Sequence, residues 1–294
     1  MSKENIVTII YVIVSHFRIA KNNTHYGKNI ILGGWAMKRN LMVLLTIMAA
    51  FTLVLAGCGS KDNTSSGDGD SKKVYKVGTE ATFAPIVSLD DKGNIVGIDV
   101  DVLQAIADEM DFEVKWESIG WEPVFQTIKN GETDIGGAGI TITDERKETF
   151  DFTEPYYESQ LLIVVKEDSK IQSLDELKDK KISVQINATG HMAANKLQGE
   201  SSPNIFAFEN QPIAIQEMLN GNVEAAIGDN SVVYEYIKAH PNDKIKVIKD
   251  DSFEKEYYGF MVQKGNKELL DKLNEGLKKI KENGKLKEIT GSDF

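Results

Sequence analysis

The amino-acid sequence predicts an α/β protein built from two lobes, and three observations support this fold class. Segments of strand and helix character alternate from Val74 onward, as in folds with largely parallel sheets. The chain has 294 residues, enough for two domains of ordinary size. A helix end, an Asn-Gly pair and a strand ending in Gly occur at 128–136 and again at 218–228. Two lobes built on one plan would explain this repeat, although the same unit is common in other folds.

The residues before this alternation have the pattern of an export signal. Lys38-Arg39 is a short basic region, 41–55 is an apolar core, and Leu-Ala-Gly leads into Cys58. This order is typical of a lipoprotein signal, so we expect 37–57 to be the signal peptide and Cys58 to carry the lipid. The alternative is a single membrane anchor, but the apolar run is shorter than the ~20 residues that a spanning helix needs.

The segments on either side of this signal are not expected to fold. Residues 1–36 fit no export pattern, whereas Met37 begins a complete signal, so we interpret 1–36 as a non-native extension from a misassigned start. Residues 59–73 contain no apolar side chain and are rich in Gly, Ser, Asp and Lys. We therefore expect 58–73 to be a flexible tether between the lipid and the folded part.

The expected elements follow from hydrophobic spacing and from turn residues. We expect Asp99 to cap a helix whose apolar residues Leu103, Ile106, Ala107 and Met110 form one buried stripe. Gly131 and Gly221 should end their helices in the left-handed conformation. In chain order we expect strand 74–79, the helix capped by Asp99, strand 112–116, helix 122–130, a strand into Gly136, strand 161–166, helix 174–177, strand 182–185, helix 190–197, strand 205–208, helix 212–219, strand 225–229 and a helix through Tyr236.

Composition and charge exclude several classes of function. Of 34 basic and 45 acidic residues, 1–57 contain six Lys and Arg and one Glu, which leaves 28 and 44 and a net charge near −16. Such a charge argues against nucleic acid as a partner. Cys58 is the only cysteine and the four histidines lack metal-ligand spacing, so we expect no disulfide, no metal and no cofactor.

The stretch 136–147 is the strongest candidate for a binding site. We expect Thr143 to cap a short helix, which puts Arg146 in the first turn, where the helix dipole disfavours a cation. A bound anion would compensate for this unfavourable position of the Arg146 charge. The Arg146 guanidinium, the Thr141 hydroxyl and the N–H groups of the loop together suit a carboxylate.

Two further considerations bear on this stretch. Its small residues, Ala138 and Gly139 among them, would let a ligand lie against bare backbone. The alternative interpretation is a Gly-rich turn with a surface arginine that pairs with Asp144 or Glu148.

Other candidate residues follow strands, where the ligands of open α/β sheets gather. Asp229 ends a strand and suits an ammonium group, while Phe83 and Trp121 could flank a ligand side chain. An anion site, a cation site and an aromatic clamp together describe a site for an α-amino acid. Taken singly, each residue has a structural alternative, because Asp229 could only cap the next helix and either aromatic residue could belong to the core.

Two phrases of the sequence resemble a known family. Ala-Gly-Ile-Thr-Ile-Thr-Asp-Glu-Arg-Lys at 138–147 and Phe-Asp-Phe-Thr-Glu-Pro-Tyr-Tyr at 150–157 are similar to the signature of amino-acid-binding solute receptors of bacterial ABC importers (extracellular solute-binding proteins, family 3). The similarity extends in order over roughly 74–288. It implies the two-lobed, periplasmic-binding-protein-like fold of type II, with the ligand in the cleft between the lobes.

The resemblance also implies roles for individual residues. In such receptors the α-carboxylate is bound at the positions of Thr141 and Arg146, the α-ammonium at Asp229, and the side chain between Phe83 and Trp121. The chain departs from the family pattern at Pro85-Ile86, at Asn187-Ala188 and in lacking an aromatic ending after Ile289, and the first two departures concern which ligand is bound. The expected ligand-binding residues are Glu80, Phe83, Trp121, Ala138, Gly139, Thr141, Arg146, Gln185, Thr189, Gly190 and Asp229.

We therefore expect a monomeric lipoprotein on the outer face of the cell membrane that binds an amino acid, closes on it and is recognised by an ABC permease. The first lobe should comprise 74–157 and 257–294 and the second 162–252, with crossing strands near 156–160 and 252–257. An enzyme is not expected. The alternatives are a dehydratase on the same fold, with Glu80 or Glu122 as its acid or base, and a sensory domain fused to a membrane-spanning region. Glu80 and Glu122 favour a basic ligand, arginine or lysine, over glutamine.

Overall fold

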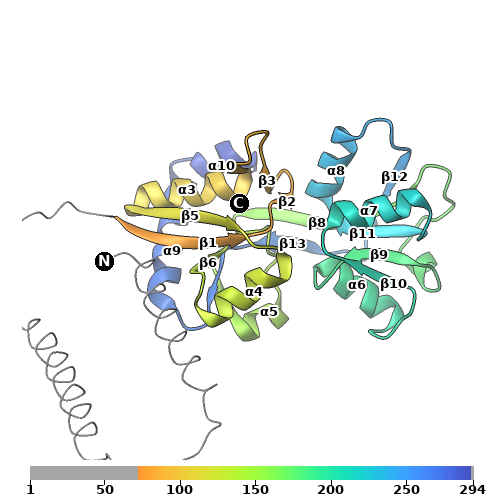
Figure 1. Ribbon diagram of the computed structural model, residues 1–294, viewed down its shortest axis with the longest axis horizontal. Helices are drawn as coiled ribbons and strands as arrows, with labels where there is room; N and C mark the ends of the chain where they lie inside the picture. Colours follow the sequence, from red (N-terminus) through yellow and green to blue (C-terminus); the bar gives the residue numbers. More distant parts are fainter. Residues whose placement is uncertain (1–71, 293–294) are drawn as a thin grey trace, which may run out of the picture. The chain divides into compact units, whose positions relative to one another are not determined.

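Two mixed β-sheets form the two lobes of the chain in the computed structural model, which describes residues 72–292 (Figure 1). The two-lobed α/β fold is confirmed, but the expectation of largely parallel sheets is wrong. In each of these two sheets the strand that arrives from the other lobe pairs antiparallel with both of its neighbours in the strand order, whereas the remaining pairings in that order are parallel. The predictions for Cys58, for 1–36, for 37–57 and for the tether up to residue 71 lie outside the described residues.

The sheet of the first lobe has the strand order β5-β1-β6-β14-β7. In parallel register, Val77 of β1 lies opposite Trp116 of β5 and opposite Ile135 of β6. β14 runs antiparallel to both β6 and β7. The strands are β1 (Lys73–Thr79), β5 (Phe112–Ser118), β6 (Ile135–Gly136), β7 (Phe150–Phe152) and β14 (Met261–Gln263). Lys73 thus belongs to a strand and not to the expected tether.

A small antiparallel sheet follows β1 and was not predicted. It consists of β2 (Thr82–Phe83), β3 (Val87–Leu89) and β4 (Ile95–Val96). Strands of two or three residues are too short to show an alternating pattern in the sequence. The consequence is that Phe83 lies in a strand and not in an open loop.

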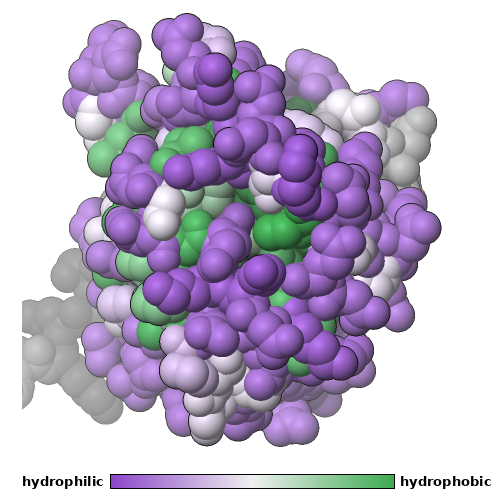
Figure 2. Space-filling view, turned by 90° about the vertical axis from the view of Figure 1, so that its right-hand side faces the viewer, coloured by the Kyte–Doolittle hydropathy of each residue, from purple (hydrophilic) through white to green (hydrophobic). Residues whose placement is uncertain are grey.

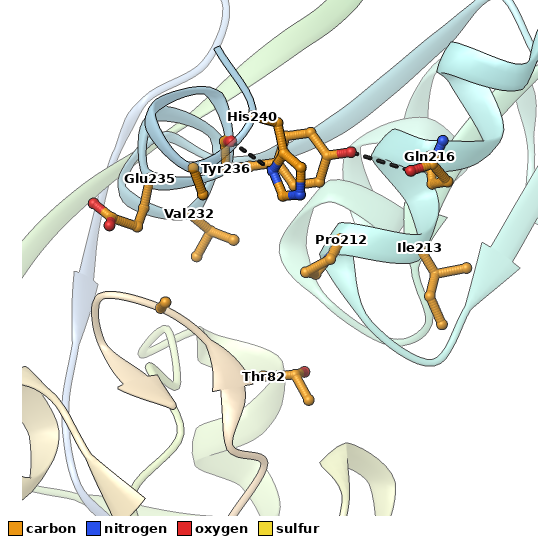
Figure 3. A pocket seen from close by; sticks show the side chains of 10 residues that line it. Thr82, Pro212, Ile213, Gln216, Val232, Glu235, Tyr236 and His240 are labelled. Atoms are coloured by element: carbon orange, nitrogen blue, oxygen red, sulfur yellow. Dashed lines mark hydrogen bonds between the residues drawn. The ribbon is translucent and has the colours of Figure 1, made fainter. Parts of the chain in front are cut away.

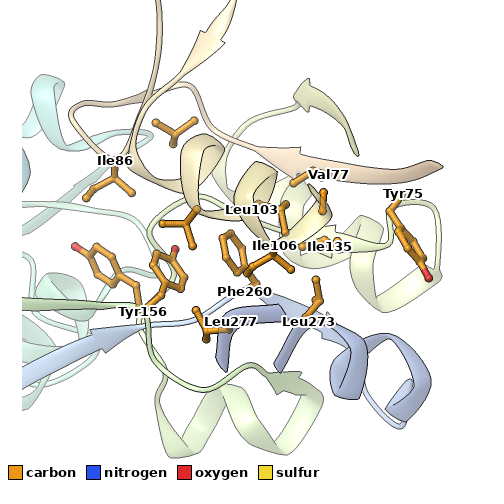
Figure 4. Packing of buried hydrophobic residues seen from close by; sticks show 14 of the residues in the cluster. Tyr75, Val77, Ile86, Leu103, Ile106, Ile135, Tyr156, Phe260, Leu273 and Leu277 are labelled. Carbon is orange, nitrogen blue, oxygen red and sulfur yellow. The ribbon is translucent and has the colours of Figure 1, made fainter. Parts of the chain in front are cut away.

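The core of the first lobe lies between the sheet and two long helices, α3 (Ile98–Met110) and α9 (Lys267–Glu282) (Figure 4). Leu103 and Ile106 of α3 pack with Leu273 and Leu277 of α9 and with Phe260. The predicted stripe is confirmed for its first three residues, while Met110 is only partly buried. The remaining helices of this lobe are α4 (Trp121–Asn130), α5 (Asp144–Thr149) and α10 (Lys285–Thr290).

Asp99 does not cap α3, which corrects the prediction. The N-cap is Gly97, and the Asp99 side chain is fully buried inside the first turn. Its carboxylate accepts hydrogen bonds from the Gly139 N–H at 2.9 Å and from the Tyr156 hydroxyl at 2.7 Å. In the sequence, an acid in the first turn of a helix cannot be told from a capping residue. The hydrogen-bond partners of Asp99 belong to distant segments of the chain.

The second lobe has the strand order β10-β9-β11-β8-β12, in which β8 is Tyr157–Lys166. β9 pairs in parallel with β10 and β11, and β8 pairs antiparallel with β11 and β12. Gly131 and Gly221 both end their helices with positive φ, of 73° and 82°, which confirms the predicted caps. The elements are β9 (Ile182–Gln185), β10 (Ile205–Phe208), β11 (Ala225–Asp229), β12 (Ile245–Ile248), the 3-10 helix η1 (Asp175–Leu177), α6 (Thr189–Gln198), α7 (Gln211–Asn220) and α8 (Asn230–Ala239).

β8 (Tyr157–Lys166) and β13 (Lys255–Tyr258) connect the two sheets. β13 pairs antiparallel with the start of β8, so that Glu256 lies opposite Ser159, and the rest of β8 continues into the second sheet. This pairing agrees with the two expected crossing segments. The residue bounds given to each lobe remain a prediction.

The outer face of the second lobe is mostly hydrophilic, with hydrophobic residues recessed among the polar ones (Figure 2). Ile213 and Tyr234 are the large apolar side chains of α7 and α8 that remain exposed. Within residues 72–292, no helix combines the length and apolar character needed to cross a bilayer.

Candidate functional site

A fixed backbone turn presents the residues of the stretch 138–141. Gly139 has φ of +63°, and a Cβ at this position would lie 2.8 Å from the Phe83 ring. Only glycine fits both conditions. The Gly139 N–H donates to Asp99, and burial raises the pKa of that carboxyl to about 7. Ala138 and Thr141 on either side are buried as well.

Arg146 points into the protein and is 7% exposed. Thr143 caps α5 as predicted, because its hydroxyl oxygen accepts the Arg146 N–H at 3.1 Å. The guanidinium donates from Nη1 to the Thr141 carbonyl at 2.8 Å and from Nη2 to the Asn187 carbonyl at 3.0 Å. Burial lowers the pKa of Arg146 to about 10, so the group stays charged at neutral pH. The alternative of a surface arginine that pairs with Asp144 or Glu148 is wrong, since Arg146 is buried and its guanidinium donates to two backbone carbonyls.

Trp121 contacts Arg146 and the second lobe at once. The Arg146 guanidinium carbon lies 5.5 Å from the centre of the Trp121 ring and 5.3 Å from that of Phe125. The Trp121 indole N–H donates to the Ile186 carbonyl at 2.8 Å. Trp121 is 5% exposed and so is Phe83, which packs in the core cluster of the first lobe. Both aromatic side chains are therefore largely packed against protein.

Asp229 lies at the end of β11 with its carboxylate buried. It accepts hydrogen bonds from the Ser159 hydroxyl at 2.9 Å and from the Tyr258 hydroxyl at 2.6 Å. Asp229 is the N-cap residue of α8, as the helix-cap alternative expected, but its side chain makes no capping hydrogen bond to that helix. Burial raises the pKa of Asp229, while these hydrogen bonds and the positive charge of Arg146 oppose that shift.

Glu256 on β13 joins this group and was missed in the sequence. Its Oε2 accepts the Thr189 hydroxyl at 2.8 Å and the Thr141 hydroxyl at 3.3 Å. Burial, followed by the charge of Asp229, raises the pKa of Glu256 to about 7. The signal available in the sequence was an acid inside an expected crossing strand, two residues before a buried tyrosine.

Glu80 and Gln185 form a second group that joins the two lobes. The buried Glu80 carboxylate accepts from the Thr82 hydroxyl at 2.5 Å and from the Gln185 amide at 2.9 Å. Burial raises the pKa of Glu80, and the charge of Glu209 adds to that effect. Glu122, by contrast, is exposed and accepts the Asn187 side-chain amide at 2.7 Å.

The structure thus arranges the predicted site residues in two clusters. Thr141, Arg146, Thr189 and Asp229 converge around Glu256, and Trp121 covers Arg146. Gly190 is at the start of α6, where a Cβ would lie 2.8 Å from the Ile227 carbonyl. Glu80 and Gln185 form the other cluster, and Phe83 lies beside Gly139.

Two cavities adjoin these clusters. One of about 560 Å³ is lined by Thr141, Thr189 and Glu256 together with residues of α6 and of 252–257. Another, of about 410 Å³, lies between Thr82 and helices α7 and α8, where Pro212, Ile213 and Tyr236 face it (Figure 3). Within residues 72–292, no three His, Cys, Asp or Glu side chains are grouped as a metal ion would require.

Comparison with known proteins identifies the family. The bacterial extracellular solute-binding proteins, family 3, match residues 75–292. The chain belongs to this family. A probable histidine-binding protein of Neisseria gonorrhoeae is 35% identical over 249 residues, which cover 84% of this chain and 93% of the relative.

Two solved structures extend the comparison. The arginine-, lysine-, histidine-binding protein ArtJ of Geobacillus stearothermophilus has a TM-score of 0.72 at 44% identity, covering 76% of this chain and 97% of that one. The ancestral amino acid-binding protein AncCDT-1, a precursor of cyclohexadienyl dehydratase, has a TM-score of 0.67 at 33% identity, covering 74% and 93%. The recognition of the family from the two sequence phrases is confirmed.

Proposed function

We propose that this solute-binding protein takes up a free α-amino acid between its lobes and delivers it to the permease of an ABC transporter. One observation carries the proposal. A buried cation, Arg146, and a buried acid, Asp229, occur together with two hydroxyls from different lobes. The α-carboxylate would be held by Arg146, Thr141 and the N–H groups around Thr189 and Gly190, and the α-ammonium by Asp229.

The cluster around Glu80 supports a basic ligand. The Glu80 carboxylate is buried, and the causes that shift its pKa are burial, two neutral hydrogen-bond donors and another acid, none of which is a cation. A buried carboxylate has to be paired or it takes up a proton. A guanidinium or ammonium on the ligand would pair Glu80, which favours arginine or lysine. The names of the histidine-binding relative and of the arginine-, lysine-, histidine-binding structure agree with that class.

Competition between amino acids tests both the function and the ligand class. Arginine at 100 times its Kd should raise the free energy of unfolding by about 2.7 kcal/mol, measured by thermal shift. Excess glutamine should not displace bound arginine. The Glu80→Gln substitution should weaken the binding of arginine more than the binding of glutamine. The matched control is Glu132→Gln, which removes an exposed acid of the first lobe.

Two results would contradict this assignment. Displacement by glutamine but not by lysine would exclude a basic ligand. If none of the twenty amino acids stabilised the protein, the proposed function itself would be excluded.

A dehydratase on the same fold is the second candidate, favoured by the similarity to the dehydratase precursor and by the raised pKa of Glu80. The same competition experiment distinguishes the two, because a binding protein returns its ligand unchanged. New products from a prephenate-like carboxylate, formed only when Glu80 is present, would favour the enzyme.

We further propose that the lipid on Cys58 holds the protein at the outer face of the membrane as a monomer. Cys58→Ser should release the protein into the medium or leave its signal unprocessed. Fractionation of cells with an antibody to the folded part measures both outcomes. A normally processed Cys58→Ser protein that stays in the membrane would exclude the anchor.

A further inference from the structure

Glu256 accepts hydrogen bonds from hydroxyl groups that, in the proposed function, would donate to the ligand carboxylate or lie beside it. Its Oε2 accepts both the Thr141 and the Thr189 hydroxyl, at 3.3 and 2.8 Å. A hydroxyl group has one hydrogen to donate. While both hydrogens point to Glu256, an incoming carboxylate cannot receive them. The protein's own carboxylate thus stands in the position of a competitor.

The backbone fixes Glu256 beside the Thr141 hydroxyl. β13 pairs with β8 so that Glu256 lies opposite Ser159, and the next residues bond to the stretch that contains Thr141. Specifically, the Ile142 N–H donates to the Tyr257 carbonyl at 2.8 Å, and the Gly259 N–H donates to the Ile140 carbonyl at 3.2 Å. Glu256 therefore remains next to Thr141 when a ligand arrives.

We propose that Glu256 occupies the carboxylate subsite in the ligand-free protein and takes up a proton from solvent when an amino acid binds. This inference rests on the proposed function. Protonation removes the negative charge that would face the ligand carboxylate and frees the hydroxyls to donate to the ligand. Glu256 is thereby a residue that sets affinity, and the affinity depends on pH.

The charges around Glu256 have opposing effects on its proton. Asp229 disfavours the ionised form and Arg146 favours it. On α6, burial lowers the pKa of His191, which disfavours a positive charge on that ring. Titratable groups on the packed elements also include Tyr157 and Glu158 of β8, Lys196 of α6, and Glu254, Lys255, Tyr257 and Tyr258 on or beside β13.

The direction of the pH effect follows from linkage. In the free protein the pKa of Glu256 is about 7, and a ligand carboxylate beside it raises that pKa further. The bound form then holds more protons than the free form, so affinity falls as pH rises through the pKa of the free protein. Between pH 6 and pH 8 the Kd should increase about ten-fold, with uptake of about one proton per ligand at pH 8.

Isothermal titration with L-arginine, in two buffers of different ionisation enthalpy at pH 6 and at pH 8, measures Kd and proton uptake. Glu256→Gln, a neutral isostere, should bind about ten-fold more tightly than the wild type at pH 8 and within about two-fold at pH 6. Its proton uptake should vanish. The matched control, Asp251→Asn, removes an exposed acid that does not line the cavity and should keep the wild-type pH dependence.

The outcomes are distinguishable. Weaker binding by Glu256→Gln would show that Glu256 contacts the ligand as a favourable partner and would overturn the proposal. Unchanged binding without proton uptake in the wild type would overturn it as well. If the wild type bound neither arginine nor another amino acid, the proposed function itself would be excluded. The proposed role of Glu256 as a competitor of the ligand carboxylate would then be excluded too.

Discussion

Replacement of Arg146 with alanine should weaken amino-acid binding by about 2–5 kcal/mol, because the ligand carboxylate is then buried without a counter-charge. Arg146 is 7% exposed, and the carbonyls of Thr141 and Asn187 already orient its guanidinium. A preoriented donor needs little further ordering when the ligand arrives. Titration calorimetry measures the change in Kd.

Two variants control for indirect effects of the Arg146 substitution. Lys147→Ala removes the neighbouring cation, which is exposed and pairs with Asp144 at 3.5 Å, and it should leave affinity unchanged. Arg146→Lys keeps the charge but loses the planar pair of donors, so an intermediate loss is expected. Thermal unfolding without ligand shows whether the fold is retained. Wild-type affinity in a folded Arg146→Ala protein would exclude Arg146 as the carboxylate partner.

Replacement of Asp229 with alanine should have an effect of similar size, about 2–5 kcal/mol, by leaving the ligand ammonium unpaired. Asp229→Asn preserves the acceptor for Ser159 and Tyr258 but removes the charge, so it separates electrostatics from packing. Both variants should lose affinity if the charge matters. Calorimetry with the same amino acid gives the comparison.

Asp251→Ala is the matched control for Asp229, since Asp251 is an exposed acid of the same part of the chain. It should bind like the wild type. If Asp229→Asn bound normally while Asp229→Ala did not, Asp229 would act through its hydrogen bonds with Ser159 and Tyr258, and another group would hold the ammonium.

The sequence by itself determined the features that depend on neighbouring residues. Thr143 caps α5 because its hydroxyl reaches an N–H three residues away, and Gly131 and Gly221 end helices because they tolerate positive φ. β9, β10 and β11 have the predicted bounds because their apolar runs are bounded by turn residues. The family signature lies in the same local phrases, at 138–147 and 150–157.

The role of Arg146 was determined partly by the sequence and partly by the tertiary structure. Its position in the first turn of a helix required compensation, and the sequence suggested an anion. The structure adds two carbonyl acceptors and two aromatic rings, which are also favourable partners for a guanidinium. The residue spacing around Arg146 does not predict contacts with carbonyls and rings from other segments of the chain.

Only the tertiary structure decided the roles of Asp99 and Glu256. Asp99 looked like a helix cap but supports Gly139, 40 positions along the chain. Glu256 meets Thr141 and Thr189 from separations of 115 and 67 residues. Such contacts depend on how the crossing strands bring the two sheets together. The hydrophobic periodicity of the sequence does not predict this arrangement. Burial, which sets the pKa of both acids, is likewise a property of the assembled lobes and not of the residues beside them.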